Sequence, residues 1–454
     1  MRTAIASLLV CALACQSTNV GRASARPPGG RADARPTLID DLQHRTFQWF
    51  WDTANAENGL VPDRWPTESF SSIAAVGFGL TAYGIGAERG WVSREAAAQR
   101  VLTTLRFFEH GVEGDKGFYY HFVDMKTGKR FKDVELSTID TTLFLAGALF
   151  CQSYFDRDNA AEREIRETVE RLYSRAEWTF FLERPPLISM GWTPEHGLHD
   201  YDYTGYNEAM ILYILALGSP THPVSPRAWN AYTATYKWEG DHLAFAPLFG
   251  HQYSHVWIDF RGIKDHFMRE KGIDYFENSR RATLFQRNYA IQNPHAWRGY
   301  GENVWGLTAC DGPFDGEWNG RKFFTYAARG VSPHELRDDG TIAPTAAASS
   351  IAFTPELSTA AIEAFVKTYP RTYTKYGFID SFNPTLNFEH KVQMGHIVEG
   401  DAWYDNDHLG IDQGPIVAMI ENHRSGLVWA TMRRNEHVRL GLQRAGFTGG
   451  WLER

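Results

Sequence analysis

The sequence predicts an all-α fold built as a double ring of helices, the (α/α)6 toroid, with long loops gathered at one mouth. Apolar residues recur at helical spacing along most of the chain, and convincing strands are few. The segments between the helices are long and rich in Gly, Pro, aromatic and acidic residues. Helical hairpins that each bury one face against their neighbours can close into a ring. A solenoid of stacked hairpins is the alternative.

The expected helices follow one another from residue 38 onward. The first two carry apolar faces at helical spacing, formed by Leu38, Leu42, Phe47, Phe50 and Trp51 in one and by Ile73, Val76, Leu80 and Tyr83 in the other. Later helices are expected at 94–109, 138–155, 162–182, 206–217, 272–291, 355–369 and 412–445. Long loops are expected at 116–135, 186–205, 296–340 and 378–409. Because long ordered loops are usually functional, we expect a binding site among them.

The first 25 residues have the features of a signal peptide, since Arg2 precedes a short apolar stretch and Ala23-Ser24-Ala25 suits cleavage before Arg26. A lipoprotein site, in which Cys15 would carry a lipid anchor, is the alternative. Residues 26–36 are rich in Pro, Gly and Arg and are expected to be a disordered lead, followed by a single domain at 37–454. We therefore expect export to the periplasm or the cell exterior, without a membrane span in the mature chain.

The net charge of −8 argues against nucleic acid and polyuronate partners, because both require a basic channel. Loss of Arg2 and Arg22 with the signal peptide would make the charge −10. Beyond residue 25 the only cysteines are Cys151 and Cys310, which could form one disulfide or remain two buried thiols. Neither has the spacing of a redox or zinc site, and we expect a monomer.

Aromatic residues make up 14% of the chain, and several Trp lie beside acids, Asn or His in the expected loops: Trp192, Trp297, Trp305, Trp318 and Trp403. Flat aromatic faces flanked by polar groups bind sugars, whose C–H faces are apolar while their hydroxyls need hydrogen-bond partners. Any one of these Trp could instead pack between helices. Their clustering indicates a carbohydrate ligand.

Acidic residues stand where the expected helices begin. Glu135 and Asp140 flank Ser137 and Thr138, either of which could be the N-cap, and Glu208 follows an aromatic loop. Burial beside an apolar helix can raise the pKa of such a carboxyl. Stabilisation of the helix dipole is the simpler explanation for each acid. A further acidic stretch, 401–412, includes Asp401 and Asp412.

Residues 250–259 would place His251, His255 and Asp259 on one helical face, if that segment is helical. Ligands at such spacing could bind a metal, but there is no HExxH arrangement or cysteine ligand. We therefore expect these residues, with the neighbouring Gln252 and Trp257, to bind sugar hydroxyls. A calcium loop starting at Asp401 or Asp405 lacks the bidentate Glu at its twelfth position.

Five segments together carry a family resemblance: ELSTIDTTL at 135–143, GYNEAMILYILALGSPTHP at 205–223, GHQYSHVWIDFRG at 250–262, YGENVWGLTACDGP at 300–313 and GIDQGPIVAMIENHRSGLVW at 410–429. They resemble the family first labelled putative glucoamylase, now glycoside hydrolase family 144, and the related domain of cyclic β-1,2-glucan synthases. The resemblance covers nearly everything from Thr37 onward.

The resemblance implies a toroidal catalytic domain, no metal or organic cofactor, and cleavage of β-1,2-glucan or sophorooligosaccharides. It implies that Glu208 is the acid, that Glu135 and Asp140 line the donor side, and that Asp401 or Asp412 serves the water. Hydrolysis of a glycosidic bond commonly needs one protonated and one ionised carboxyl. The substrate-binding residues expected from the five motifs and the aromatic loops are Trp192, Tyr206, Asn207, His251, Gln252, His255, Trp257, Asp259, Trp305, Asp311, Trp403 and Gln413.

Endo action with inversion is our default expectation. Exo action that releases sophorose and transglycosylation are the alternatives within the same chemistry. A non-catalytic glucan-binding protein is the alternative of a different class, but a pure binder gains little from desolvated carboxylates. A polysaccharide lyase on the same toroid is a further alternative. The net negative charge of this chain argues against it, because the uronate substrate of a lyase is also negatively charged.

Overall fold

The computed structural model describes residues 37–182 and 186–453. The expectations for the signal peptide, for Cys15 and for residues 26–36 therefore concern residues outside those ranges. A compact unit begins at Thr37, whose side chain caps the first helix in a reciprocal pair of hydrogen bonds with Asp40. Within these ranges no helix is long and apolar enough to cross a bilayer.

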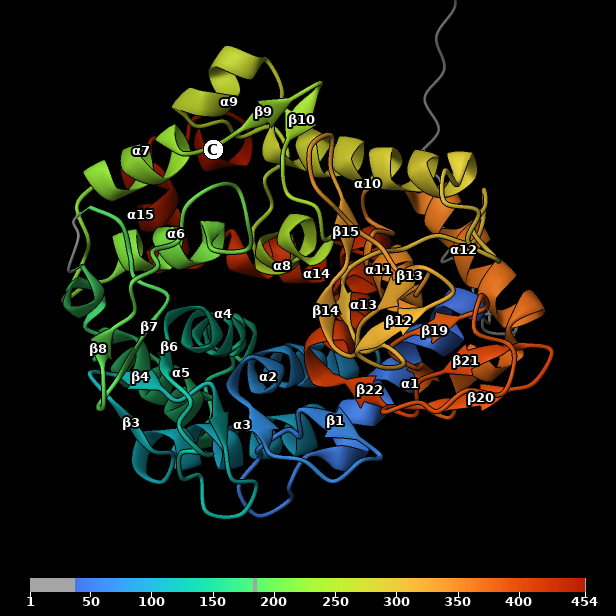
Figure 1. The fold of residues 1–454 in the computed structure, drawn as a ribbon. Coiled ribbons are helices and arrows are strands. Elements are labelled where there is room, and N and C mark those ends of the chain that lie inside the picture. Colours follow the sequence, from blue (N-terminus) through green and yellow to red (C-terminus); the bar gives the residue numbers. More distant parts are fainter. Residues whose placement is uncertain (1–36, 183–185, 454) are drawn as a thin grey trace, which may run out of the picture. The chain divides into compact units, whose positions relative to one another are not determined.

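Helices dominate the described residues (Figure 1). They are α1 (Leu38–Thr53), α2 (Ile73–Glu88), α3 (Arg94–His110), α4 (Thr138–Tyr154), α5 (Ala160–Ser174), α6 (Met210–Gly218), α7 (Arg227–Ala234), α8 (Phe249–Trp257), α9 (His266–Lys271), α10 (Tyr275–Gln292), α11 (Pro344–Ser349), α12 (Pro355–Thr368), α13 (Gly410–Arg424), α14 (Leu427–Met432) and α15 (Glu436–Arg444). Short 3₁₀ turns lie at Trp178–Phe181, Pro370–Thr372 and Gly450–Glu453.

The helices form two layers, one buried and one facing solvent on its outer side. Nearly every residue of α2, α4, α6, α8 and α13 is buried, whereas α1, α3, α5 and α15 bury only one face. In the buried layer α2 packs against α4 and α13, α4 against α6, and α13 against α8 and α11. In the outer layer α1 packs on α13, α3 on α2, α5 on α4, α15 on α6 and α12 on α11. This helix-on-helix arrangement agrees with the predicted fold class.

Two glycines set the close crossing of α2 and α4. A Cβ on Gly147 would lie 2.0 Å from the carbonyl oxygen of Gly77, and a Cβ on Gly77 would lie 2.2 Å from that of Leu143. The two helix backbones therefore touch, which only glycine permits.

Strands are more numerous than the sequence predicted, so the described part of the chain is helix-rich with many short strands rather than free of them. They are β1 (Arg64–Trp65), β2 (Ser71–Ser72), β3 (Gly114–Asp115), β4 (Phe118–Tyr119), β5 (Phe122–Val123), β6 (Leu136–Ser137), β7 (Gly191–Thr193), β8 (Gly197–Leu198), β9 (Trp238–Glu239), β10 (His242–Leu243), β11 (Ala309–Cys310), β12 (Gly316–Trp318), β13 (Arg321–Phe323), β14 (Ala327–Ala328), β15 (Gly330–Val331), β16 (Leu336–Arg337), β17 (Tyr373–Thr374), β18 (Gly377–Phe378), β19 (Phe382–Asn383), β20 (His396–Val398), β21 (Ala402–Tyr404) and β22 (His408–Leu409). Strands of two or three residues are too short to show an alternating pattern.

The strands pair in ten small antiparallel sheets that tie loops together. Within the described ranges two sheets have three strands, in the orders β6-β7-β8 and β19-β21-β20, and the others are pairs. In the pair β1 and β22, Arg64 lies opposite Leu409 and Trp65 opposite His408. This pair joins an early loop to the start of α13.

Three expected helices have different boundaries in the structure. The expected helix at 162–182 is α5, which ends at Ser174, and a separate 3₁₀ turn follows at Trp178–Phe181. Helix α6 begins at Met210 rather than at Tyr206, so Glu208 precedes the helix. The expected helix at 412–445 is three helices, because Gly426 adopts a positive φ of 70° and Asn435 caps a new helix. Helices α7, α8, α9 and α11 had not been assigned from sequence, except that a helical 250–259 had been considered. Cys151 and Cys310 are buried free thiols.

Candidate active site

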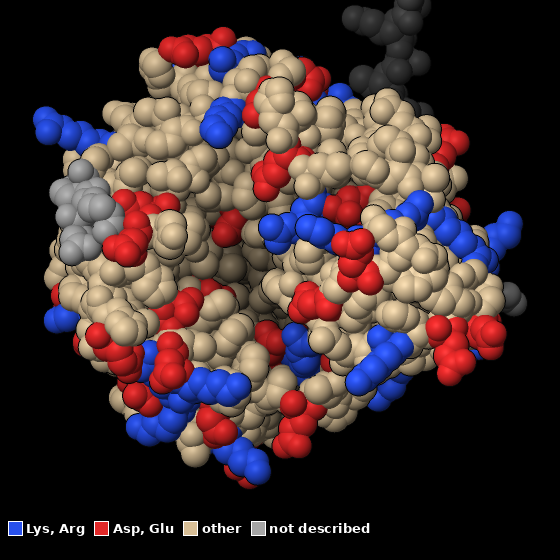
Figure 2. Space-filling view, viewed as in Figure 1, with Lys and Arg blue, Asp and Glu red and all other residues tan. Residues whose placement is uncertain are grey.

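A cavity of about 390 Å³ lies among the loops that join the buried helices. Its lining residues are Asp63, Arg64, Phe70, Ser72, His121, Phe122, Asp140, Tyr326, Leu409 and Ile411. Figure 2 shows Asp and Glu side chains around the central hollow of the molecule. Aromatic and apolar walls with a few charged groups are typical of a small-ligand site.

On one side of the cavity, His121 lies between two of the acids expected from sequence. Its Nδ1 is 2.9 Å from Glu135 Oε1, and its Nε2 is 3.5 Å from Asp140 Oδ1. Although burial lowers the pKa of His121, Asp140 and Glu135 outweigh it and raise that pKa to about 9. His121 is therefore an imidazolium at neutral pH. Burial raises the pKa of Asp140, while His121 keeps that of Glu135 below its usual value.

Ser137 fixes the position of Asp140. It is the N-cap of α4, its side chain accepts a hydrogen bond from the backbone N–H of Asp140 at 3.1 Å, and its hydroxyl donates to Asp140 Oδ2 at 2.5 Å. The expectation of an N-cap at Ser137 or Thr138 is thus met by Ser137. β6, which ends at Ser137, pairs with β7 and holds this turn in place.

Glu208 occupies the turn directly before α6. Its backbone carbonyl accepts a hydrogen bond from Ser254 at 2.7 Å, and its half-buried side chain has one oxygen, Oε2, without a hydrogen-bond partner among the described residues. Burial raises the pKa of Glu208 to about 7, with a further contribution from Asp140. This raised pKa favours the protonated form of Glu208 near neutral pH, as a proton donor requires.

On the other side of the cavity, Arg64 joins three acids. Its Nη1 is 2.6 Å from Asp311 Oδ2 and 4.0 Å from Asp407 Oδ2, and its Nε is 3.3 Å from Asp63 Oδ2. The β1–β22 pair brings Arg64 to this position. Burial raises the pKa of Asp311 to about 6 in spite of Arg64. A carboxylate–guanidinium pair of this kind offers both donors and acceptors to sugar hydroxyls.

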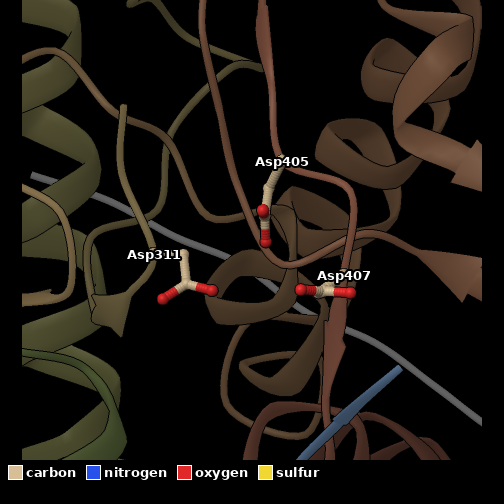
Figure 3. A group of neighbouring side chains, drawn as sticks. All are labelled: Asp311, Asp405 and Asp407. Atoms are coloured by element: carbon tan, nitrogen blue, oxygen red, sulfur yellow. The ribbon is translucent and has the colours of Figure 1, made fainter. Parts of the chain in front are cut away.

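Asp311, Asp405 and Asp407 converge in Figure 3 and have one carboxylate oxygen each within 4.8 Å of the others. Three oxygen ligands at such separations could hold a hard divalent cation. However, the guanidinium of Arg64 already supplies a positive charge to Asp311 and Asp407. The donor set therefore fits an ion pair better than a metal site.

Asp380 and Asp412 are buried, and both interact electrostatically with Asp311. Asp412 is in the first turn of α13, and Asp380 stands just before β19. Burial raises the pKa of both carboxyls, that of Asp412 to about 7. Tyr253 and Tyr326 are within electrostatic range of the pair, and Tyr253 is also in range of Glu208. Tyr253 is therefore within electrostatic range of both groups of acids.

A second cavity, of about 520 Å³, includes Tyr206 and Asn207, which directly precede Glu208 in the sequence, in its lining. The Tyr206 hydroxyl is 3.2 Å from Ser279 Oγ, and Asn207 Oδ1 accepts a hydrogen bond from Tyr232. These two expected binding residues thus lie next to the expected acid. Trp192, in β7, is half-buried and packs edge-on against Phe180.

The expected sugar-binding residues of 250–259 are not brought to either cavity. They are buried and bonded within the protein: His251 Nε2 to the carbonyl of Phe245 (3.1 Å), His255 Nε2 to Ser279 Oγ (3.0 Å), Gln252 Nε2 to the carbonyl of Ala346 (2.8 Å), Trp257 Nε1 to Thr81 Oγ1 (2.9 Å), and Asp259 to Arg261 (2.8 Å) and Arg433. Burial lowers the pKa of both histidines to about 3, so both rings are neutral. This segment is part of the core.

Four other expected residues lie away from the first cavity. Trp305 and Trp403 are buried, and Trp403 Nε1 donates to the carbonyl of Met394 at 2.7 Å. Gln413 Nε2 donates to the carbonyl of Phe378 at 3.0 Å. Asp401 is partly exposed, accepts a hydrogen bond from Tyr404 at 2.9 Å and lies 3.7 Å from Arg371. Of the two acids expected to serve the water, Asp412 alone is near the cavity.

Sequence reasoning missed several residues of the site, namely Asp63, Arg64, His121, Tyr326 and Asp380. Each is isolated in the sequence from the motifs that carried the resemblance. Asp380 could have been noticed, because it follows an apolar pair in a Gly- and Asn-containing loop. Arg64 had no such signal, since its position depends on strand pairing with Leu409, which is distant in the sequence.

Comparisons with known proteins agree with this picture. A family model described as "Putative glucoamylase" matches residues 200–436. An exo β-1,2-glucooligosaccharide sophorohydrolase (non-reducing end) of Parabacteroides distasonis is 30% identical over 90% of this chain, and the chain spans only 57% of that relative's length. The relation to cyclic β-1,2-glucan synthases stays an expectation.

Solved structures resemble the chain over most of its length. A "putative glucoamylase" of Bacteroides uniformis has a TM-score of 0.79 at 34% identity, covering 91% of this chain and 98% of that one. An endo-β-1,2-glucanase of Chitinophaga pinensis, solved with sophorotriose and glucose, has a TM-score of 0.79 at 29% identity, with coverage of 91% and 98%. Since the family model matches more than half of the sequence, the chain belongs to the putative glucoamylase family, with relatives among the β-1,2-glucanases of glycoside hydrolase family 144.

Proposed function

We propose that the chain is a glycoside hydrolase that cleaves β-1,2-glucan or sophorooligosaccharides, acting inside the glucan chain and with inversion. One observation carries the proposal. Glu208, a carboxyl whose pKa is raised to about 7, and a second group of acids that includes Asp412 are both within electrostatic range of Tyr253. Relatives named as β-1,2-glucanases and a sophorohydrolase support the substrate.

In the proposed reaction Glu208 donates its proton to the glycosidic oxygen as the bond to the anomeric carbon breaks. A water attacks that carbon from the opposite face and gives its proton to Asp412. Inversion follows when the base activates water rather than attacking the sugar itself. His121, held by Glu135 and Asp140, and Arg64, held by Asp311, would bind sugar hydroxyls in the cavity.

The closed ring of six helical hairpins is also part of the proposal. The observed layers, with α2, α4, α6, α8, α11 and α13 buried, have the composition that such a ring requires. We propose in addition that the chain is exported, so that its glucan substrate is met outside the cytoplasm.

The proposal is tested by incubating the purified protein with linear β-1,2-glucan and following new reducing ends. We expect cleavage of this glucan, with or without EDTA, and none of starch or cellulose. Long intermediate products early in the reaction would support endo action, whereas sophorose alone would assign exo action. Glucose released from starch, with β-1,2-glucan untouched, would refute the proposed substrate. Binding of β-1,2-glucan without any cleavage would assign a glucan-binding protein.

A further inference from the structure

Tyr326 presents an exposed aromatic surface in the first cavity. The residue is 48% exposed, and it shares the lining of this cavity with Arg64 and Asp140. The described residues include five other exposed large apolar side chains, none of which lines this cavity: Trp65, Met190, Tyr201, Ile291 and Leu336. An aromatic face beside charged groups can hold the apolar C–H face of a sugar ring.

The two phenylalanines of this lining, Phe70 and Phe122, come from a different part of the chain. Their ring centroids are 4.3 Å apart, and Phe122 also stacks on His121 with centroids 3.9 Å apart. All three of these rings are less exposed than Tyr326. Tyr326 is therefore the aromatic residue of the cavity with the most surface to offer a ligand.

Arg329 binds both ends of the loop that leads to Tyr326. Its Nη1 donates to the carbonyl of Cys310 at 2.6 Å, and its Nη2 donates to the carbonyl of Thr325 at 3.2 Å. The β11–β14 pair joins the same two ends, with Cys310 opposite Ala327. One guanidinium thus closes the base of the loop, directly beside Tyr326.

Asp339 neutralises Arg329 and fixes its orientation. Two hydrogen bonds join their side chains, from Nε to Oδ1 at 2.8 Å and from Nη2 to Oδ2 at 2.7 Å, and both residues are 0% exposed. Asp339 Oδ2 also accepts the backbone N–H of Phe324 at 3.1 Å. A buried ion pair repays its desolvation only when its geometry and hydrogen bonds are complete. The pair therefore holds the base of the loop in one arrangement.

Gly312 shows how closely the loop surrounds this guanidinium. A Cβ on Gly312 would lie 2.1 Å from Nη2 of Arg329 and 2.3 Å from the carbonyl oxygen of Phe324, which Nη2 also binds. A side chain at position 312 would therefore push Arg329 away from the carbonyls that it holds.

Asp311, at the start of the loop, is held by other contacts as well. Its carboxylate accepts a hydrogen bond from Arg64 at 2.6 Å, and its backbone carbonyl accepts one from Ser381 Oγ at 2.6 Å. A shift of Arg329 should consequently disturb Tyr326 more than Asp311.

Building on the proposed function, we propose that the ring of Tyr326 stacks on a glucose unit of the glucan in the first cavity, and that Arg329 is the positioning residue that holds this ring in place. The hydroxyls of a β-linked glucose unit are equatorial, so its two faces are apolar and its rim is polar. Tyr326 then meets one face, while His121 and Arg64 in the same lining meet hydroxyls of the rim.

The stacking role is tested with two substitutions of Tyr326. Binding of sophorotriose is measured by calorimetry with Glu208→Gln present in each protein, which keeps the ligand intact, and cleavage of β-1,2-glucan is measured without it. Tyr326→Phe keeps the ring, so Kd and KM should stay within about threefold of their original values. Tyr326→Ala removes the ring, so both should rise by about tenfold or more, with kcat changed less than KM. The matched control is Ile291→Ala, because Ile291 is 46% exposed and lines neither cavity.

Gly312→Ala tests the role of Arg329 without removing a charge. We expect its Kd for sophorotriose to rise by up to the amount seen in Tyr326→Ala. Combined with Tyr326→Ala it should add little, because both changes remove the same contact. Gly301→Ala, where an added Cβ meets nothing within 4 Å, is the control. If Gly312→Ala does not fold, Arg329→Lys takes its place in the same comparison, since lysine keeps the charge but not the planar fork.

Unchanged affinity for sophorotriose in folded Tyr326→Ala would overturn the stacking role. Equal losses in Tyr326→Phe and Tyr326→Ala would also overturn it, because they would assign the contact to the hydroxyl. Full additivity of Gly312→Ala and Tyr326→Ala would overturn the positioning role of Arg329, since a merely structural loss is independent of the ring. Binding of sophorotriose that depends on residue 326, without cleavage of glucan by the unsubstituted protein, refutes the proposed function alone.

Discussion

Glu208 is expected to behave as a proton donor because its surroundings hold a proton on it near pH 7. Glu208→Gln keeps the size and hydrogen bonding of the side chain but removes the transferable proton. We expect kcat on β-1,2-glucan to fall by about 10²-fold or more, with KM little changed. In the wild type kcat/KM should decline above about pH 7, as Glu208 ionises.

The matched control is Glu302→Gln, because the Glu302 side chain is 74% exposed and forms a surface ion pair with Arg287. Steady-state kinetics of both variants check the prediction. A loss of tenfold or less in Glu208→Gln would assign the role to another acid, and Glu135 would be tested next.

His121 is expected to make stability depend on pH. The pKa of His121 is raised from 6.5 to about 9 in the folded protein, so its ion pairs stabilise the fold fully below pH 6.5 and are lost as the pH rises through about 9. The difference in Tm between wild type and His121→Gln should therefore be largest near pH 6 and shrink toward pH 10. Thermal unfolding across this range is the measurement.

His295→Gln, a change at an exposed histidine, serves as the control and should give a small difference in Tm at every pH. A Tm difference for His121→Gln that stays constant from pH 6 to pH 10 would contradict the proposed imidazolium.

At the residue scale, the sequence indicated which acids stand near helix starts. Asp140 and Asp412 lie in the first turns of α4 and α13, and Glu208 directly precedes α6. The sequence did not indicate that His251 and His255 are buried in the core, because helical spacing does not tell which face of α8 meets the core. It also missed Arg64, which reaches the site only through the β1–β22 pair.

The crossing of α2 and α4 leads to a prediction at the scale of elements. An added methyl on Gly147 would overlap the backbone oxygen of Gly77, so the helices would have to separate. Gly147→Ala should lower the free energy of unfolding by about 1–3 kcal/mol or more. Denaturation by urea, followed by circular dichroism, is the measurement.

Gly301→Ala is the control for Gly147→Ala, since an added Cβ there meets nothing within 4 Å. Equal stabilities of the two variants would mean that α2 and α4 do not cross as closely as described.

At the element scale, the expected helices at 94–109, 138–155, 272–291 and 355–369 correspond to α3, α4, α10 and α12, because long amphipathic or apolar stretches carry a strong periodic signal. The short helices and strands carry no such periodic signal. A two-residue strand such as β1 is specified by its partner rather than by its own sequence, so no local pattern predicts it.

At the scale of the whole molecule, the net charge of −8 fits a neutral glucan better than an anionic one. We expect the rate on β-1,2-glucan to change little between about 0.05 and 0.5 M NaCl, because binding of a neutral chain requires no charge neutralisation. Reducing-end assays over this range check the prediction. Cleavage or binding of polyuronate that weakens steeply with salt would contradict it and favour the lyase alternative.

The β1–β22 pair also determines when, during folding, the site can exist. It joins segments about 340 residues apart, and Thr67 donates its backbone N–H to Asp407 across the same gap. Contacts of such high sequence separation form late, since loop closure must precede them. The cavity is therefore assembled from both ends of the folded chain. A ligand that fills it would bind only the completed fold and would stabilise that state against unfolding.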